Sequence, residues 1–368
     1  KHDLRDEYPF GLQAVPQTEI RRIHASSGTT GKPVVGTYTE NDLKMWAECV
    51  ARVLAVGDIG PGDVVQVAYG YGLFTGGLGA HDGATISGAS VIPISSGNTQ
   101  KQMTLMHDFG TTILCCTPSY AMFLGEAMQE CEYPRDEFKL KVGVFGAEPW
   151  TEKMRQKLEA TLGIKAYDIY GLSEIAGPGV GYECEHQCGT HLNEDLFYPE
   201  ILDPNTGEPL PEGQFGELTF THLTKEGMPL LRYRTHDLTA LHYDKCKCGR
   251  TLVRMDRILG RCDDMLIIRG VNVFPSQIED VILKLPEYEP HFLLTVDRVN
   301  NTDTSELKVE VKEEYFTDDM ATMVGLQKKL EAELRSVIGL GFKVKLVEPK
   351  GIERSEGKAK RVIDNRKI

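Results

Sequence analysis

The sequence has no excess of positive charge and no long run of Lys or Arg. Its 368 residues include 41 Lys and Arg against 54 Asp and Glu, which gives a formal net charge of −13. The counterion release that drives binding to nucleic acid needs a basic surface, and this composition does not supply one. We therefore expect neither nucleic acid nor a membrane surface as a partner.

Long hydrophobic runs and a signal peptide are missing as well. No apolar run approaches the roughly 20 residues that span a bilayer, and the first ten residues, KHDLRDEYPF, do not resemble a secretory signal. The nine cysteines show no disulfide-framework spacing, and Cys115 and Cys116 fall in an apolar run where buried thiols are common. A cytoplasmic location is predicted. Since the chain has no initiator Met, we also expect residues to precede it.

The first half of the chain alternates short apolar runs with segments of helical period. The runs, many of their residues β-branched, read as buried strands, and the segments between them read as helices. This order predicts an α/β domain with a mostly parallel sheet covered by helices and with ligands at the carboxyl ends of the strands. The predicted strands are 63–69, 89–95, 111–117, 140–146 and 165–170, and the predicted helices include 98–109, 118–130 and 151–162.

The pattern changes after residue 200. Turn residues at 203–213 and the alternating stretch 216–223 predict a β-rich subdomain over about 184–258. Further on, the order strand, helix, strand, strand, helix, strand predicts a small α+β domain with a ferredoxin-like arrangement. Its elements are 265–269, 276–285, 290–297, 304–312, 317–338 and 342–348. We place the large domain at 1–262 and the small one at 263–368.

The stretch SSGTTGKP, residues 26–33, combines four hydroxyl side chains, two glycines and a lysine. It lacks the spacing of a Walker P-loop, and its flanks alternate like strands, so the loop joins strand to strand. A helix then begins near Thr39, with Asp42 as the partner in a capping box. Glycines and hydroxyls that turn donors inward suit an anion such as phosphate. A mobile hairpin is the alternative.

Six further motifs accompany this loop in a fixed order, and they identify a family. They are AYGYGLFTGGLGAHDGA (68–84), FGAEPW (145–150), DIYGLSE (168–174), LLRYRTHDL (230–238), GRCDDMLIIRGVNVFPSQIE (260–279) and RSEGKAKRV (354–362). Together with HASSGTTGKPVVGTYTENDL, they resemble the motifs of adenylate-forming ligases, in the form found in phenylacetate–coenzyme A ligases. The resemblance covers nearly the whole chain, although members of this family usually have several tens of residues before the phosphate loop.

The resemblance implies ATP and Mg²⁺ as ligands and assigns residues to them. Ser26, Ser27, Gly28, Thr29, Thr30, Gly31 and Lys32 would hold the β- and γ-phosphates, and Glu174 would bind Mg²⁺. Around the nucleoside it places Gly146, Ala147, Glu148, Asp168, Tyr170, Gly171 and Ser173, with Asp237 on the ribose hydroxyls and Arg261 on ribose or phosphate. The alternative is that Asp237 or Arg261 forms an ion pair at the surface.

Two residues of the small domain complete this assignment. Lys358 matches the family's lysine that bridges the attacking carboxylate and the α-phosphate, where a fixed cation stabilises the developing charge. Lys360 stands two residues away and is the competing choice. Asp263 matches the hinge about which the small domain turns.

The acid pocket is predicted at Tyr69, Tyr71, Phe74 and Gly76. Aromatic side chains beside small residues leave a slot for a flat ring, although the same residues could be core. The resemblance implies an aryl or arylacetic acid as substrate.

A second group of residues points to a metal. The stretch ECEHQCGTH offers Cys184, His186, Cys188 and His191, and KCKCG offers Cys246 and Cys248, a set that suits tetrahedral Zn²⁺. The family pattern favours Cys184, His191, Cys246 and Cys248, with Cys188 or His186 as the substitute. Free cytosolic thiols are the alternative.

The predicted function is an acid–thiol ligase that forms an acyl-adenylate from ATP and transfers the acyl group to coenzyme A. The competing interpretations are an adenylating enzyme with another acceptor, such as the F420-adenylating relatives, and a non-catalytic nucleotide-binding protein. A homodimer is what the family implies.

Overall fold

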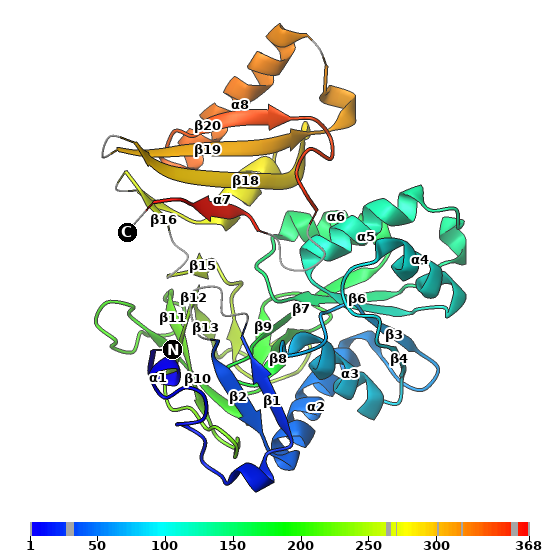
Figure 1. Ribbon diagram of the computed structural model, residues 1–368, viewed down its shortest axis with the longest axis vertical. Helices are drawn as coiled ribbons and strands as arrows, with labels where there is room; N and C mark the ends of the chain where they lie inside the picture. The colour runs from blue at the N-terminus through cyan, green and yellow to red at the C-terminus, as the bar shows by residue number, and fades with distance from the viewer. Residues whose placement is uncertain are drawn as a thin grey trace. The chain divides into compact units, whose positions relative to one another are not determined.

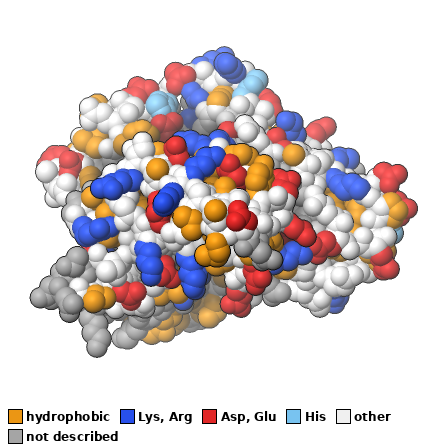
Figure 2. Space-filling model, turned by 90° about the horizontal axis from the view of Figure 1, so that it is seen from above, with side chains coloured by type: hydrophobic (Ala, Val, Ile, Leu, Met, Phe, Trp, Pro, Cys, Tyr) orange, Lys and Arg blue, Asp and Glu red, His pale blue; other side chains and the backbone are white. Residues whose placement is uncertain are grey.

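The computed structural model describes residues 2–26, 33–262, 266–269, 271–299, 302–317, 319–354 and 360–366. The chain forms two compact units. The first unit contains residues 1–148 and 158–258, and the second contains residues 149–157 and 259–368. No helix among the described residues is long and apolar enough to cross a membrane. Figure 2 shows basic and acidic side chains interspersed over one face of the molecule.

The first unit is built on a nine-stranded mixed sheet, in the order β13-β14-β9-β8-β7-β6-β5-β3-β4. Strands β3 to β7 run parallel, and β8, β9, β14 and β13 extend the sheet with antiparallel pairs. The strands are β3 (Val64–Val67), β4 (Ser90–Ile92), β5 (Ile113–Cys116), β6 (Val142–Gly146), β7 (Lys165–Leu172), β8 (Gly177–Glu183), β9 (Thr190–Leu192), β13 (Leu241–His242) and β14 (Arg254–Met255).

Helices lie on both faces of this sheet. Helices α2 and α3 pack together on one side, and α4 and α5 pack together on the other (Figure 1). The order reverses at β3, since β3 is followed by β4 on one side and by β5 on the other. Such a switch point opens a crevice at the carboxyl ends of the strands. The helices in this part of the chain are α1 (His2–Asp6), α2 (Glu40–Leu54), α3 (Gly76–Ile86), α4 (Thr99–Asp108), α5 (Pro118–Glu130) and α6 (Glu152–Leu162), of which residues 152–157 belong to the second unit.

Two smaller β structures belong to the same unit. Strands β1 (Arg22–Ala25) and β2 (Val35–Tyr38) form an antiparallel hairpin, and β10 (Phe197–Leu202), β11 (Gly216–His222) and β12 (Tyr233–Thr239) pair antiparallel in turn. Of the strands in the predicted β-rich segment, β9, β13 and β14 join the large sheet, while β10 to β12 belong to another sheet. One core of buried side chains, including Trp46, Val67 and Phe220, runs through the unit.

The second unit carries a four-stranded sheet in the order β20-β19-β18-β21. Buried residues of helices α7 and α8, such as Ile278 and Leu330, share a core with Leu294 and Val309 of the sheet. Its elements are β15 (Gly260–Arg261), β16 (Leu266–Ile268), β17 (Val271–Val273), α7 (Pro275–Ile282), β18 (Tyr288–Val299), β19 (Thr302–Val311), α8 (Met320–Ile338), β20 (Lys343–Val347) and β21 (Val362–Asp364).

The α/β class, with a large first part and a small α+β second part, is confirmed, but the predicted ferredoxin-like strand order is wrong. The predicted first strand, 265–269, is the short β16, which pairs with β17 as a separate hairpin. β20 pairs directly with β19, and β21 from the end of the chain adds parallel to β18. Local sequence pattern marks a strand but does not encode which neighbour it will pair with.

Candidate active site

The hairpin β1–β2 presents the predicted phosphate loop. Ala25 pairs with Val35, and just beyond them the Ser26 amide donates to the Val34 carbonyl at 2.9 Å. The Val34 amide in turn donates to Ser26 Oγ at 3.0 Å, so the hydroxyl of Ser26 closes the hairpin. Ser27, Gly28, Thr29, Thr30, Gly31 and Lys32 lie outside the described residues. The segments on either side of these residues are strands, as the flanking sequence predicted.

Three predicted nucleoside residues stand at the carboxyl end of β6. A Cβ on Gly146 would lie 2.1 Å from the Ile169 carbonyl oxygen of β7, so only glycine fits there. Ala147 follows with φ at +72°, a strained value for a residue with a side chain. Glu148 Oε1 accepts a hydrogen bond of 2.6 Å from the Ser119 amide in the first turn of α5. The structure therefore gives Glu148 a capping contact that its sequence position did not reveal.

The end of β7 brings Tyr170 together with Asp237. The Tyr170 hydroxyl donates to Asp237 Oδ2 at 2.6 Å, and Asp237, on β12, is 8% exposed. The close packing here needs Gly171, where a Cβ would lie 1.9 Å from the Gly177 carbonyl oxygen. Asp168 lies half-buried two residues before Tyr170, and its amide donates to Glu183 at 2.8 Å.

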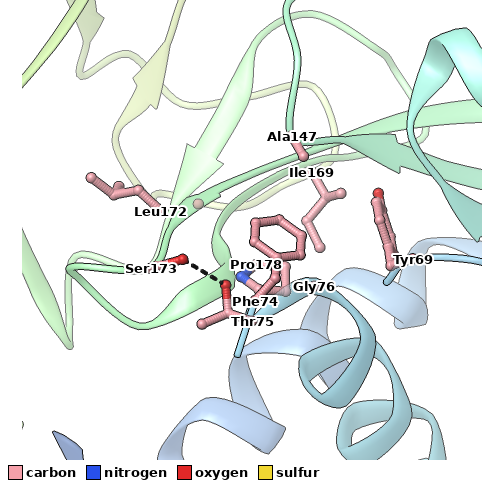
Figure 3. A pocket seen from close by; sticks show the side chains of 10 residues that line it. Tyr69, Phe74, Thr75, Gly76, Ala147, Ile169, Leu172, Ser173 and Pro178 are labelled. Carbon is pink, nitrogen blue, oxygen red and sulfur yellow. Dashed lines mark hydrogen bonds between the residues drawn. The ribbon is translucent and has the colours of Figure 1, made fainter. Parts of the chain in front are cut away.

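Glu174 lies in the turn after β7, and its neighbours hold that turn. Glu174 is buried at 8% exposure. The hydroxyls of Ser173 and Thr75 are 3.2 Å apart (Figure 3). The Tyr38 hydroxyl of β2 donates to the Ser173 carbonyl at 3.3 Å, which connects the turn to the base of the phosphate-loop hairpin.

A pocket of about 90 Å³ opens beside these groups. Figure 3 shows Tyr69 and Phe74 from the segment after β3, facing residues from the ends of β6 and β7. Of the predicted residues, Tyr69, Phe74, Gly76, Ala147, Gly171 and Ser173 line it, and the sequence did not reveal Thr75, Ile169, Leu172 and Pro178. Tyr71 is not among its lining residues, because its hydroxyl lies 3.3 Å from His81 Nδ1. The lining is mainly apolar, as a site for an aromatic ring would be.

The remaining predicted residues belong to the second unit. Arg261 is half-buried on β15. Asp263 and Lys358 lie outside the described residues, so the hinge and the catalytic lysine stay predictions.

The four predicted zinc ligands come together in the first unit. One ligand atom from each of Cys184, His191, Cys246 and Cys248 lies within 4.8 Å of every other. The sulfurs of Cys184 and Cys246 are 3.8 Å apart, and Cys248 Sγ is 3.5 Å from His191 Nε2. Ligands about 2.3 Å (sulfur) and 2.0 Å (nitrogen) from a tetrahedral ion stand at about these separations from each other.

The competing ligands are placed differently. Cys188 is exposed, but its sulfur lies 3.6 Å from that of Cys246, so it borders the cluster. His186 is exposed and its nearest ionic partner is Glu185 at 3.9 Å. The cluster is assembled from the end of β8, from β9 and from the segment between β13 and β14.

A mixed sheet with the antiparallel hairpin β1–β2, a buried carboxylate after β7 and an acid on β12, followed in the chain by a small α+β unit, is the arrangement of an adenylate-forming enzyme. The family models agree: that of AMP-binding enzymes matches residues 12–223, and that of the AMP-binding enzyme C-terminal domain matches residues 270–366.

Comparison with individual proteins gives the particular family. The chain is 52% identical over 381 residues to the phenylacetate–coenzyme A ligase of Thermus thermophilus, covering 100% of this chain and 86% of the relative. It is 52% identical over 370 residues to the phenylacetate–coenzyme A ligase of Escherichia coli K12, covering 100% and 84%. The chain belongs to the phenylacetate–coenzyme A ligase family of AMP-binding enzymes.

A solved structure shares the fold over the full chain. The crystal structure of 2-hydroxyisobutyryl-CoA ligase in the postadenylation state, in complex with 2-HIB-AMP, has a TM-score of 0.92 at 31% identity. The match covers 100% of this chain and 79% of that one.

Proposed function

We propose that this chain is an ATP-dependent ligase that activates phenylacetate, or a similar aryl or arylacetic acid, and joins it to coenzyme A. The observation that carries the proposal is identity of 49% to 52% with four phenylacetate–coenzyme A ligases, each covering 100% of this chain. The pocket and the polar groups at the ends of β3, β6 and β7 support it, because they set an apolar slot beside residues that are proposed to bind the nucleotide.

In the first step, a carboxylate oxygen of the acid attacks the α-phosphorus of ATP. The bond to the β-phosphate breaks, pyrophosphate leaves and an acyl-adenylate forms. Ser26 and the loop after it would hold the β- and γ-phosphates, and Asp237, oriented by Tyr170, would accept hydrogen bonds from the ribose. Glu174 would hold Mg²⁺, which neutralises phosphate charge when bound. Lys358 would stabilise the charge that develops between the carboxylate and the α-phosphate.

In the second step, the coenzyme A sulfur attacks the acyl carbonyl carbon and AMP leaves, which yields a thioester. The small domain is proposed to turn about Asp263 between the two steps, as in other lid-type enzymes. The apolar lining of the pocket, with Tyr69 buried and Phe74 beside it, would shield the adenylate from water.

A structural zinc ion is proposed at Cys184, His191, Cys246 and Cys248. The ligand separations fit tetrahedral coordination, and three cysteines with one histidine are a ligand set typical of structural zinc. The site would tie β9 to the segment between β13 and β14, and so fasten the edge of the large sheet. Cys188 is the substitute ligand. We also propose a cytoplasmic homodimer, since ATP and coenzyme A are cytoplasmic and the family implies a dimer.

The alternative acceptors are less well supported, because four relatives that cover the whole chain are coenzyme A ligases. The test is a panel of acids, each incubated with ATP, Mg²⁺ and coenzyme A, with products identified by mass spectrometry. We expect phenylacetyl-CoA and AMP. Release of pyrophosphate without loss of free thiol would favour another acceptor, and binding of ATP without pyrophosphate exchange with any acid would indicate a non-catalytic protein.

A further inference from the structure

A buried lysine stands next to the Glu174 turn and has no assigned role. Lys225 lies in the segment between β11 and β12 and is 5% exposed. Its ammonium donates to the Ile175 carbonyl at 3.1 Å and lies over the Tyr38 ring, 3.6 Å from the centroid. Ile175 directly follows Glu174, so the lysine holds the backbone beside the carboxylate that is proposed to bind Mg²⁺.

The segment that carries Lys225 is fixed to the start of α2. The Asp42 carboxylate accepts the amides of Glu226 and Gly227 at 2.8 and 2.9 Å. Asp42 also forms the predicted capping box with Thr39, whose hydroxyl donates to Glu226 at 2.7 Å. Because Thr39 directly follows β2, Lys225 is anchored at the base of the phosphate-loop hairpin.

Further donors hold the same turn. His222 Nδ1 accepts the Leu230 amide at 2.8 Å, which assigns the proton to Nε2. That Nε2 donates to the Ile175 carbonyl at 2.8 Å, so Lys225 and His222 share one acceptor. On the other side of Glu174, the Tyr38 hydroxyl donates to the Ser173 carbonyl. The backbone is therefore held both before and after the carboxylate.

Burying an ammonium is costly, and an apolar side chain would pack here at less cost. Burial lowers the pKa of Lys225 to about 8, and the Asp42 carboxylate opposes that shift. The Tyr38 ring offers the partial compensation of a cation–π contact. We attribute the burial of the Lys225 ammonium to the Ile175 carbonyl that it holds in place.

We infer that Lys225 is a positioning residue that locks the Glu174 turn to the base of the phosphate-loop hairpin. It would keep the Glu174 carboxylate at a fixed distance from strand β2, and so help present Mg²⁺-ATP in one geometry for attack by the acid. The inference rests on the proposed function, because it gives Lys225 a role in the adenylation step only.

The test compares Lys225→Met with wild type and with Lys44→Met, the same change at a side chain that is 69% exposed. Acid-dependent ATP–pyrophosphate exchange is measured while Mg²⁺ is titrated, and thioester formation is measured from supplied phenylacetyl-adenylate. Lys225→Met should raise the Mg²⁺ concentration for half-maximal exchange about tenfold, the order expected for one charged hydrogen bond. The KM for the acid and the use of supplied adenylate should stay within about twofold of wild type.

An unchanged Mg²⁺ dependence in Lys225→Met, or an equal loss of both half-reactions, would overturn the inference. If Lys225→Met does not fold, Tyr38→Phe keeps the ring and removes only the bond to Ser173. It should raise the Mg²⁺ requirement about threefold, and an unchanged requirement would overturn the inference too. Absence of exchange in the wild type would instead refute the proposed function.

Discussion

Asp237 is expected to set the affinity for ATP, and Tyr170 is expected to act through it. Asp237 is 8% exposed, and its Oδ2 accepts the Tyr170 hydroxyl at 2.6 Å, so the carboxylate is fixed before the nucleotide arrives. Asp237→Ala removes an ionised acceptor from the ribose. Loss of one hydrogen bond to a charged group costs about 1.5–3 kcal/mol, which is about a 10- to 150-fold rise in the KM for ATP.

Tyr170→Phe leaves the carboxylate in place and removes only the bond that orients it. A loss of about 0.5–1.5 kcal/mol predicts a rise of about 2- to 13-fold in the KM for ATP. If Tyr170 acts only through Asp237, adding Tyr170→Phe to Asp237→Ala should raise the KM for ATP little further, because the two side chains act as one unit.

The assay is acid-dependent ATP–pyrophosphate exchange over a range of ATP, with the KM for phenylacetate measured in parallel. Tyr198→Phe is the matched control, since Tyr198 is 54% exposed on β10. The reasoning fails if the two substitutions act independently in the double variant, or if the KM for the acid rises as much as that for ATP.

Three other predictions concern separate parts of the chain. The purified protein should contain about one zinc ion per chain by elemental analysis. Cys246→Ser should lose the ion and melt earlier, whereas the half-buried Cys131→Ser should do neither, and a metal-free wild type would remove the zinc proposal. Burial, with the Lys225 ammonium second, lowers the pKa of His222 from 6.5 to about 3. Since the unfolded state then binds a proton that the folded state does not, stability should fall as pH drops below 6.5, by about 2 kcal/mol at pH 5. His222→Gln should lose this part of the pH dependence of the urea midpoint, and an identical dependence would contradict the assignment. Phe74→Ala should raise the KM for phenylacetate about 2- to 13-fold without changing that for ATP, unlike the exposed Phe109→Ala, and equal effects of the two would argue against the pocket.

Local pattern was enough to predict most elements of the large sheet and its helices. The predicted helix 118–130 is α5 (Pro118–Glu130), and the predicted strand 140–146 contains β6 (Val142–Gly146). Apolar period and capping residues act within a few positions of each other, so the sequence records them directly. The capping box of Thr39 and Asp42 is one such case.

Partner choice between distant segments could not be predicted in the same way. Nothing local indicates that β21 pairs with β18, or that β9 joins the large sheet while β10 does not. The sequence did not show the direction of side chains either. Glu148 accepts a hydrogen bond from the Ser119 amide at the start of α5, and the Tyr71 hydroxyl lies beside His81. The role inferred for Lys225 depends on three segments that meet only in the fold.

The grouping of these cysteines with His191 was predicted because several cysteines and histidines close together in a sequence are typical of a metal site. The sequence placed the candidate ligands in two separate stretches, and the family pattern favoured Cys184 over Cys188. In the structure, both sulfurs lie near that of Cys246, so the choice between them depends on burial, which a sequence does not show.

Formation of the thioester tests the central claim most directly. Phenylacetate, Mg²⁺-ATP and coenzyme A are incubated with the purified chain, and the products are identified by mass spectrometry. The account predicts phenylacetyl-CoA and AMP in equal amounts, with pyrophosphate exchange that needs the acid but not coenzyme A. Exchange that does not depend on any acid, or AMP without a thioester, would contradict it.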